Sequence, residues 1–409
     1  MEILLLNQAF YPDVVATAQY ATDLAVCLAQ SGHRVSVLTS RRGYDNPGQV
    51  FAGSEVWKGI RIVRVPMLCL GKQSRWRRAL DFGSFFVTCL LRMLLLRRFD
   101  LIIGLTSPPL ISALGAMLAV TKGGKFMFWV MDLNPDQAIA AGWLRAGSRT
   151  ARLLNVALRF SLEHSDQVIA LDRFMADRLT AKGVPRNKIS VIPPWSLDSA
   201  IRYDTVGRHT FRRDHGLAGK FVVMYSGNHS PCHSMETLLK AAHNLRHRSE
   251  IAFCFVGGGS EFHRIKETAK ADGLTNLLFI PYQPLGRLSA SLSAADLHVV
   301  VMGDLFVGIV HPSKVYNIRS MGIPFLYIGP PSGHIVELNP AGSFRHSDVQ
   351  GVEQFILRTS ALSLREHPTP SPPADAWRFS RQTLLPRMLQ VVNSLTAQPP
   401  STQGIEVFD

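Results

Sequence analysis

Short apolar runs alternate with longer segments of helical periodicity along the first half of the chain. The runs contain few polar positions and cover residues 3–6, 35–39, 60–65, 101–105, 126–131 and 167–171. Between the first two runs, residues 17–31 carry apolar side chains at helical spacing, and Gly32 follows. Strands that are apolar throughout are buried on both faces. The alternation therefore predicts a parallel sheet covered by helices on both sides.

The alternation stops near Pro193 and Pro194 and resumes after a polar stretch, ending at about Gly219, that we expect to be a linker. The second series of expected strands covers residues 221–225, 251–256, 277–280, 297–301 and 324–328. The predicted fold class is α/β, with two doubly wound Rossmann-like domains facing a central cleft. We expect residues 1–200 and 215–378 to form these domains. A last helix, within residues 379–398, is expected to pack back on the N-terminal domain.

The composition excludes several classes of protein. Of the 409 residues, 46% are hydrophobic and 18% are charged, so the chain is not disordered. The 5 cysteines include no C-x-x-C pair, which argues against a disulfide framework or a structural zinc site and indicates a reducing compartment. The net charge of +14 indicates an anionic partner. Aromatic-interleaved basic motifs are missing, so we expect that partner not to be nucleic acid.

A basic, apolar segment over residues 72–98 predicts a helix with two possible roles. Its cations are Lys72, Arg75, Arg77, Arg78, Arg92, Arg97 and Arg98. On a helix, Asp81, Ser84, Thr88 and Arg92 share one narrow face, and the rest is apolar. Such a helix is either an interfacial anchor on an anionic membrane or a core helix whose arginines reach out to solvent.

The same segment contains the longest apolar stretch, and it falls short of the roughly 18–20 residues that a spanning helix needs. The first residues have an acid, Glu2, where a secretory signal has cations, and they predict a buried strand instead. We therefore expect a cytoplasmic protein, peripheral on the inner face of the plasma membrane if the helix is an anchor.

Open parallel sheets bind ligands at the carboxyl ends of their strands, so we expect the chemistry there. Gly227 and Asn228 follow the first strand of the second half, in a turn of small residues that lets backbone N–H groups approach a phosphate. Gly257 and Gly258 end the next strand. A tight turn that binds nothing has the same sequence features, so both interpretations stay open.

The strongest local signal is Pro312-Ser313-Lys314, followed one turn later by Asn317. Ser313 is a good N-cap for a helix to residue 321, and the turn before it would present free N–H groups to a diphosphate. Lys314 would lie in the first turn, where the helix dipole disfavours a cation, so we expect an anion nearby. The alternative is a lysine that faces solvent.

Two aspartates and two histidines follow other strands. We expect Asp132 to hold sugar-like hydroxyl groups and Asp136 to cap the helix that follows it. His229 and His233 could contact a ligand, but we expect solvated loop residues; they are four positions apart, and no third metal ligand lies near them in sequence. We accordingly expect no bound metal.

Taken together and in order, these motifs resemble the family 4 retaining glycosyltransferases of the GT-B fold, especially bacterial members that build exopolysaccharide, of the colanic acid and lipopolysaccharide type. The shared segments are Phe10-Tyr11-Pro12-Asp13, Gly32-His33-Arg34-Val35, Thr106-Ser107-Pro108-Pro109, Asp132-Leu133-Asn134-Pro135-Asp136, Tyr225-Ser226-Gly227-Asn228, Val256-Gly257-Gly258-Gly259 and Pro312-Ser313-Lys314.

The resemblance implies transfer of a sugar from a nucleotide-diphosphate sugar to an acceptor that is a saccharide or a sugar linked to a polyprenyl diphosphate. It implies retention of configuration, no metal, an acceptor-side N-terminal domain and a donor site on the second domain. The catalytic residues would be Asp132 and Lys314. The donor would be bound by Gly227, Asn228, Gly257, Gly258, Pro312, Ser313, Lys314 and Asn317.

The chain departs from the family pattern at two glutamates, which align with Ile309 and Asn317. In the family the first glutamate contacts the donor sugar and the second holds the ribose. The usual paired glycines of the first loop are replaced by Ala16-Thr17-Ala18. These departures keep open the alternative of an inactive relative that serves as a partner subunit. A nucleotide-sugar epimerase of the same fold is a second alternative, but it would need acid/base carboxylates in the cleft, and the second domain has few.

Overall fold

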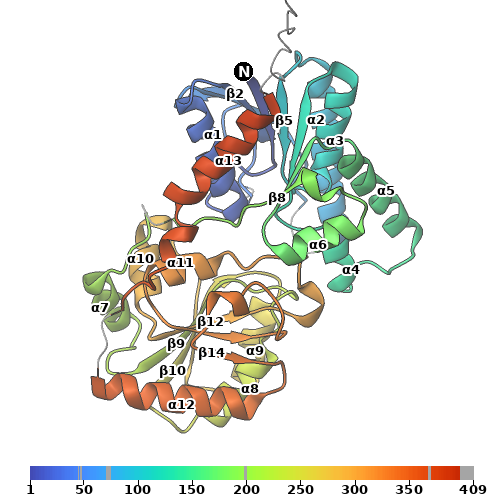
Figure 1. Cartoon of the computed structure of the whole chain (residues 1–409). Helices are drawn as coiled ribbons and strands as arrows, with labels where there is room; N and C mark the ends of the chain where they lie inside the picture. The colour runs from blue at the N-terminus through green and yellow to red at the C-terminus, as the bar shows by residue number, and fades with distance from the viewer. Residues whose placement is uncertain (45, 47, 71–74, 198–199, 367–369, 397–409) are drawn as a thin grey trace, which may run out of the picture.

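The computed structural model describes residues 1–44, 46, 48–70, 75–197, 200–366 and 370–396, which form two lobes (Figure 1). The described part of the N-terminal lobe has a sheet in the order β3-β4-β2-β1-β5-β6-β7-β8. Neighbouring strands are parallel except β3 and β4. The strands are β1 (Glu2–Leu6), β2 (Arg34–Ser40), β3 (Ser54–Trp57), β4 (Ile60–Val65), β5 (Leu101–Gly104), β6 (Lys125–Trp129), β7 (Gln167–Ala170) and β8 (Ile189–Val191).

Helices cover both sides of this sheet, with α1 on one side and α2, α3 and α5 on the other (Figure 1). The helical segments are α1 (Ala16–Gln30), α2 (Arg75–Leu94), α3 (Ile111–Lys122), α4 (Asp136–Ala140), α5 (Arg149–Glu163), α6 (Arg173–Ala181) and the 3-10 turn η1 (Arg186–Lys188). The apolar strands are buried almost completely, as their sequences predict. None of the helices described is long and apolar enough to cross a bilayer.

The described C-terminal lobe has a parallel sheet in the order β11-β10-β9-β12-β13-β14. Its strands are β9 (Phe221–Asn228), β10 (Ile251–Gly258), β11 (Leu277–Ile280), β12 (Leu297–Val301), β13 (Phe325–Ile328) and β14 (Gly342–Phe344). Its helical segments are α7 (Thr205–Asp214), α8 (Glu236–Asn244), α9 (Phe262–Ala271), α10 (Leu285–Ser293), η2 (Asp304–Phe306), α11 (Lys314–Ser320), η3 (Val336–Leu338) and α12 (Val349–Glu366). The predicted pair of doubly wound α/β lobes is confirmed.

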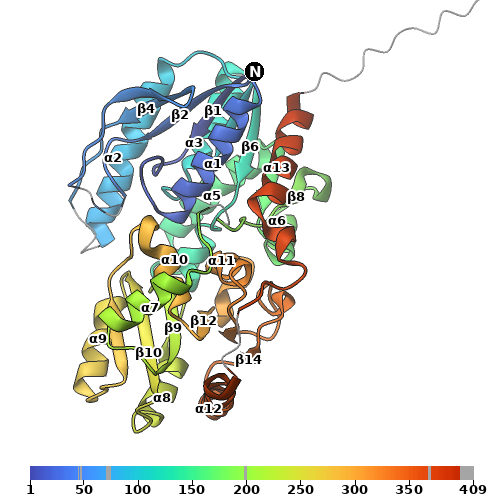
Figure 2. The same ribbon diagram turned by 90° about the vertical axis from the view of Figure 1, so that its left-hand side faces the viewer.

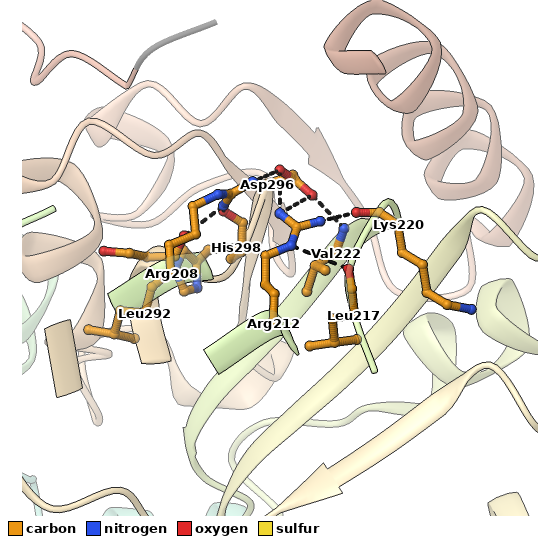
Figure 3. Close-up of polar contacts among 10 residues, drawn as sticks. Arg208, Arg212, Leu217, Lys220, Val222, Leu292, Asp296 and His298 are labelled. Carbon is orange, nitrogen blue, oxygen red and sulfur yellow. Dashed lines mark hydrogen bonds and ion pairs between the residues drawn. The ribbon is translucent and has the colours of Figure 1, made fainter. Parts of the chain in front are cut away.

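The stretch expected to be a linker contains helix α7, so that expectation was wrong. Asp296, just before β12, accepts hydrogen bonds from Arg208 and Arg212 of α7 and, at 2.7 Å, from the N–H of Val222 (Figure 3). These contacts fix α7 against the amino ends of β9 and β12. The C-terminal lobe therefore begins at α7 rather than at residue 215. The polar sequence of α7 concealed this, because its arginines bind inward.

The chain crosses between the lobes twice, and the two crossings lie side by side. The N–H of Ser196 on the first crossing donates to the carbonyl of Phe379 on the second at 2.8 Å. After the turn η4 (Ala376–Phe379), helix α13 (Arg381–Thr396) runs along the N-terminal lobe beside α1 (Figure 2). Its buried residues Leu384, Leu385, Met388 and Val392 belong to the hydrophobic core of that lobe. Residues 397 and 398 of the expected helix lie outside the described residues.

The order of strands reverses between β1 and β5 in one sheet and between β9 and β12 in the other. Such switch points are where doubly wound sheets bind ligands, beyond the carboxyl ends of the strands. The lobes touch on this side: the N–H of Leu133, after β6, donates to the carbonyl of Ile309, after β12, at 2.9 Å. The fold therefore places the loops after β6, β9 and β12 next to one another.

Candidate functional site

The glycines after β9 and β10 bring two backbones into close contact. Gly227 pairs with Gly257, and Asn228 with Gly258, in the parallel register. Gly227 and Gly257 have φ angles of +139° and +131°, and a Cβ on Gly257 would lie 2.1 Å from the carbonyl oxygen of Gly227. Side chains do not fit there, so glycine is required. The structure thus brings these four predicted residues together at the switch point.

Lys314 reaches across to this pair of strand ends. Its Nζ lies 3.5 Å from the centre of the Tyr225 ring, and a Cβ on Gly227 would be 2.7 Å from that nitrogen. The ammonium group is buried and has no hydrogen-bond partner among the described residues. Burial lowers the pKa of Lys314 to about 7. The alternative of a solvent-facing lysine was therefore wrong.

A buried ammonium group without hydrogen bonds is costly, and the face of an aromatic ring offsets only part of that cost. An anion bound beside Gly227 would supply the missing partner and raise the pKa of Lys314 again. The geometry therefore fits a site for a phosphate or diphosphate, with the lysine and the glycine backbone on its two sides.

Two histidines lie beside Lys314, and the expectation that they are solvated was wrong. The Nδ1 of His229 lies 3.2 Å from the carbonyl oxygen of Gly258, and that of His233 lies 2.7 Å from the carbonyl oxygen of Val301. Burial, and then the charge of Lys314, lower the pKa of His229 to about 4 and that of His233 to about 3. Both rings are therefore neutral near pH 7, so Lys314 is the group of this cluster that can carry positive charge there.

The start of α11 differs in part from its prediction. Ser313 precedes the helix, but its side chain makes no capping hydrogen bond; its hydroxyl group contacts Tyr20 of α1 instead. Pro312 is buried. Among the described residues, the N–H groups of Ser313 and Lys314 donate no backbone hydrogen bond. The predicted free N–H groups are thus present, while the predicted serine cap was wrong.

Asn317 and Ile309 both take part in contacts at the junction of the two lobes. The Oδ1 of Asn317 accepts a hydrogen bond of 2.8 Å from the N–H of Leu197, on the first crossing between the lobes. Ile309 is buried and binds Leu133 through its carbonyl. Asn317, one turn beyond Lys314, thus binds the first crossing between the lobes, which we call the hinge.

Asp132 lies in the turn after β6, on the opposite lobe. Burial raises the pKa of its carboxyl group to about 6. Burial, together with the charge of Asp132, also raises the pKa of Cys232, in the loop after β9 of the other lobe. Asp132 therefore borders the same region as Lys314. Asp136 does not act as a helix cap: it is the first residue of α4, after the N-cap Pro135, and pairs with Lys182 at 2.9 Å.

Some neighbours of the site did not stand out in the sequence. Tyr282, after β11, is 52% exposed, and a Cβ on Gly258 would lie 2.9 Å from its ring. The Sγ of Cys232 lies 3.8 Å from the amide nitrogen of Gln137, and burial, together with the charge of Asp132, contributes to the raised pKa of this thiol. The strand-end rule points to Tyr282 once β11 is recognised, but no local signal connects Cys232 with the other lobe.

Two family models match the chain: a glycosyl transferase 4-like domain over residues 16–195, and glycosyl transferases group 1 over residues 207–304. The chain belongs to the family 4 glycosyltransferases of the GT-B fold. It is therefore a transferase enzyme. WcaI of Escherichia coli (strain K12), named as a colanic acid biosynthesis glycosyl transferase, is 29% identical over 337 residues, covering 79% of this chain and 82% of the relative.

Solved structures share the fold of this glycosyltransferase. Sucrose-phosphate synthase from Thermosynechococcus elongatus has a TM-score of 0.73 at 16% identity, covering 97% of this chain and 99% of that one. HepE of Anabaena, solved in complex with UDP-glucose, has a TM-score of 0.69 at 15% identity, covering 96% of this chain and 100% of that one. At these identities the likeness establishes the two-lobed architecture.

We predict that Lys314→Met stabilises the ligand-free protein by about 1–3 kcal/mol near neutral pH, because it removes a buried, unsatisfied ammonium group. The lysine must lose its proton to become neutral, so the gain is largest below pH 7 and fades as the pH rises toward 10.5. Thermal and urea unfolding at several pH values would measure it. The control is Lys266→Met on the exposed face of α9, expected to change stability by less than about 0.5 kcal/mol. Destabilisation of Lys314→Met would contradict the unpaired state of the lysine.

Proposed function

We propose that the protein is a retaining glycosyltransferase that moves a sugar from a nucleotide-diphosphate sugar to a saccharide acceptor linked to a polyprenyl diphosphate, in the biosynthesis of a bacterial surface polysaccharide. The observation that carries the proposal is the unpaired ammonium group of Lys314 beside Gly227 at the β9/β12 switch point. The name of the E. coli relative supports the pathway class. The UDP-glucose complex of HepE supports a nucleotide-sugar donor.

Lys314 is suited to stabilise the leaving diphosphate. Negative charge grows on that group as the glycosidic bond breaks, and a preorganised cation and N–H groups in a water-poor site stabilise it by several kcal/mol. The free N–H groups of Ser313 and Lys314 lie at the same turn. We propose that these groups take the role that a divalent ion has in other transferases, and that no metal cofactor is needed.

Asp132 is suited to bind a hydroxyl group of the donor sugar or the acceptor. Its pKa of about 6 leaves it mostly ionised near pH 7, as a hydrogen-bond acceptor on the lobe opposite Lys314. Attack on the face from which the diphosphate leaves would retain the configuration without a protein nucleophile. The acceptor would then approach from the side of the N-terminal lobe.

A second candidate, an inactive relative that serves as a partner subunit, is favoured by one observation. Ile309 is buried and the Oδ1 of Asn317 is used by the hinge, so neither replaces the glutamate with which it aligns. Such a protein would bind the nucleotide sugar without transferring it, and a turnover assay on lipid-linked acceptors separates the two candidates.

Helix α2 supports a membrane-bound acceptor, because its polar stripe faces the protein. The Oγ of Ser84 accepts a hydrogen bond of 2.8 Å from the N–H of Leu68, the Oδ1 of Asp81 accepts one of 2.9 Å from the N–H of Leu70, and the hydroxyl of Thr88 donates to the carbonyl of Pro66. The polar side chains of α2, which would normally face solvent, therefore form hydrogen bonds with the backbone after β4.

The outward face of α2 is apolar instead. Its large exposed apolar residues are Trp76, Leu80, Val87, Leu91 and Leu94, followed by Leu95. Arg97 and Arg98, also exposed, follow directly. Lys72 and the side chains of Arg75 and Arg78 lie outside the described residues. An exposed apolar row next to arginines fits an interface with an anionic lipid surface, where a polyprenyl-linked acceptor resides.

We predict that one series of UDP-, GDP- or ADP-sugars raises the melting temperature of the protein without added metal and with a chelator present. A ligand that binds only the folded state stabilises it by about 2.7 kcal/mol at 100 times its dissociation constant. Lys314→Met, compared at equal stability, should lose most of this shift. A shift that depends on a divalent ion would contradict the metal-free mechanism, and no shift with any series would contradict the donor class.

We also predict that donor affinity falls above pH 7. The bound diphosphate holds Lys314 in its charged form, while the free protein loses that proton above about pH 7, so binding at higher pH must take up a proton. Affinity is expected to drop by up to about tenfold per pH unit. Calorimetry in two buffers with different heats of ionisation would detect the proton uptake. A flat profile between pH 7 and 9 would contradict the role of Lys314.

We predict that the protein sediments with vesicles containing phosphatidylglycerol more than with neutral vesicles, and less so at high salt. Leu91→Glu should weaken this binding about tenfold, because it removes buried apolar area and adds a repelled charge. The matched control is Val206→Glu on α7, at a position 77% exposed on the other lobe. Equal binding of both variants and the wild type would show that α2 does not contact lipid.

A further inference from the structure

Three buried polar side chains meet where the lobes touch, outside the donor site. Asp172, the N-cap of α6, comes from the N-terminal lobe, and His311 and His334 come from the C-terminal lobe. The Oδ2 of Asp172 lies 2.8 Å from the Nδ1 of His311 and 3.1 Å from the Nδ1 of His334. The two imidazole rings are stacked, with centroids 3.7 Å apart and an interplanar angle of 9°.

The distances define which groups donate. The Oδ1 of Asp172 accepts a hydrogen bond from the N–H of Met175, so its Oδ2 is left for the histidines. The Nε2 of His311 lies 2.7 Å from the hydroxyl of Tyr316 on α11. A neutral His311 with its proton on Nδ1 donates to Asp172 and accepts from Tyr316. Both ring nitrogens of His334 are buried with no hydrogen-bond partner among the described residues, so its Nδ1 approaches Asp172 without hydrogen-bond geometry and its Nε2 is open to a proton.

The arrangement fits a shared carboxylate better than a metal ion. A metal lies near the plane of each imidazole that binds it, along the nitrogen lone pair, and two parallel stacked rings cannot both direct their lone pairs at one ion between their planes. The carboxylate oxygen of Asp172 lies within 3.1 Å of both Nδ1 atoms, and His311 alone of the two rings forms a hydrogen bond with it in the part of the chain that the structure describes. The cluster therefore joins the lobes by the hydrogen bond between His311 and Asp172 and by the close contact of His334 with both.

We propose that Asp172 is a positioning residue that clasps the two lobes together through His311 and His334, and so holds the turn that carries Lys314. His311 precedes Pro312-Ser313-Lys314 directly, and its other nitrogen binds the helix that follows this turn. On the other side, Asp172 begins α6, whose Arg178 donates to the carbonyl of Val307 at 2.6 Å. Opening of the clasp would therefore release the turn from the contacts that hold it on the side of α6 and on the side of α11.

The surroundings add few compensating charges. The titratable and charged groups around the cluster are Arg173 and Arg178 on α6, Tyr316 and Arg319 on α11, Tyr20 on α1 and Glu337 on η3. Arg173 and Glu337 form an exposed ion pair of 2.5 Å, and Arg178 binds a carbonyl. At neutral pH the carboxylate of Asp172 is therefore stabilised by hydrogen bonds from the N–H of Met175 and from His311 rather than by a paired cation.

The clasp should weaken in acid. Burial, and then the adjacent His334, lower the pKa of His311 to about 4, although Asp172 acts in the opposite direction. In separated lobes the ring would regain its ordinary value of 6.5, so the closed form binds fewer protons than the open form. The stabilisation of the closed form is complete above pH 6.5 and is lost as the pH falls toward 4. Two stacked imidazolium ions would also repel each other.

Small-angle scattering of the ligand-free, full-length protein tests the clasp without reference to donor or acceptor. The radius of gyration of the wild type should rise as the pH falls from 7.5 to 4.5, while circular dichroism shows that the lobes stay folded. Asp172→Asn keeps the helix cap but loses the charge, so it should be more expanded at pH 7.5 and open at a higher pH. His334→Phe leaves one imidazole beside the carboxylate and should reduce the expansion in acid.

The matched control is Glu337→Gln, which removes the exposed ion pair at the same contact between the lobes and should behave like the wild type. The consequence for donor binding rests on the proposed function: if Asp172→Asn is closed one tenth of the time, its apparent affinity for a nucleotide sugar should fall about tenfold. Nucleotide sugars that fail to bind even the wild type would contradict the proposed function, and scattering alone would then decide the clasp.

Three results would overturn the inference. One is a wild-type radius of gyration that does not change with pH while the protein is folded. Another is a scattering profile of Asp172→Asn that coincides with that of Glu337→Gln at every pH. The third is a stoichiometric metal in the purified protein that His334→Phe removes, which would make the cluster a metal centre.

Discussion

A buried ammonium group that lacks a partner sets the main constraint on this protein. Lys314 loses water by lying between the ring of Tyr225 and the backbone of Gly227, and nothing in the described protein replaces the lost hydrogen bonds. The surrounding residues fit this one requirement. Glycine leaves room beside the nitrogen, and the histidines stay neutral, so they do not compete for an anion. The fold thus places the ammonium group of Lys314 where the C-terminal sheet reverses its strand order, between β9 and β12.

Contacts between the lobes fix the position of the turn that carries Lys314. The hydrophobic core of the N-terminal lobe continues into C-terminal residues such as Phe306 and Val310, so much of the contact is apolar and has little directional preference. The relative orientation of the lobes is fixed by a few polar contacts, which are Leu133 with Ile309, Arg178 with Val307, and Asp172 with His311. In a GT-B enzyme, such links determine where the turn that carries Lys314 lies relative to Asp132.

The N-terminal lobe has a second unusual feature in α2, whose orientation follows from the chain just before it. Residues 66–70 after β4 are not paired in the sheet, and their backbone groups need partners. The polar stripe of α2 supplies them, which leaves apolar side chains on the outside. The proposed donor site and the outward apolar row thus lie on different lobes, an arrangement that suits the proposed water-soluble donor and lipid-linked acceptor.

The sequence by itself determined the two sheets and most of their strands, because runs such as residues 101–105 are apolar enough to be buried on both faces. It also located the residues at the strand ends, from Gly227 to Lys314, since the ends of parallel strands meet at one edge. It misjudged α7, His229 and the cap at Ser313, because polar residues have similar patterns whether they face water or bind inward.

Only the tertiary structure decided which way those polar groups point and what they meet. Asp172 and His311 are 139 positions apart, and each belongs to a different lobe, so no local pattern could connect them. The same holds for Asn317, whose side chain binds Leu197 between the lobes, and for the outward face of α2. Periodicity is a property of one segment, whereas the partner of a polar side chain depends on how distant segments pack together.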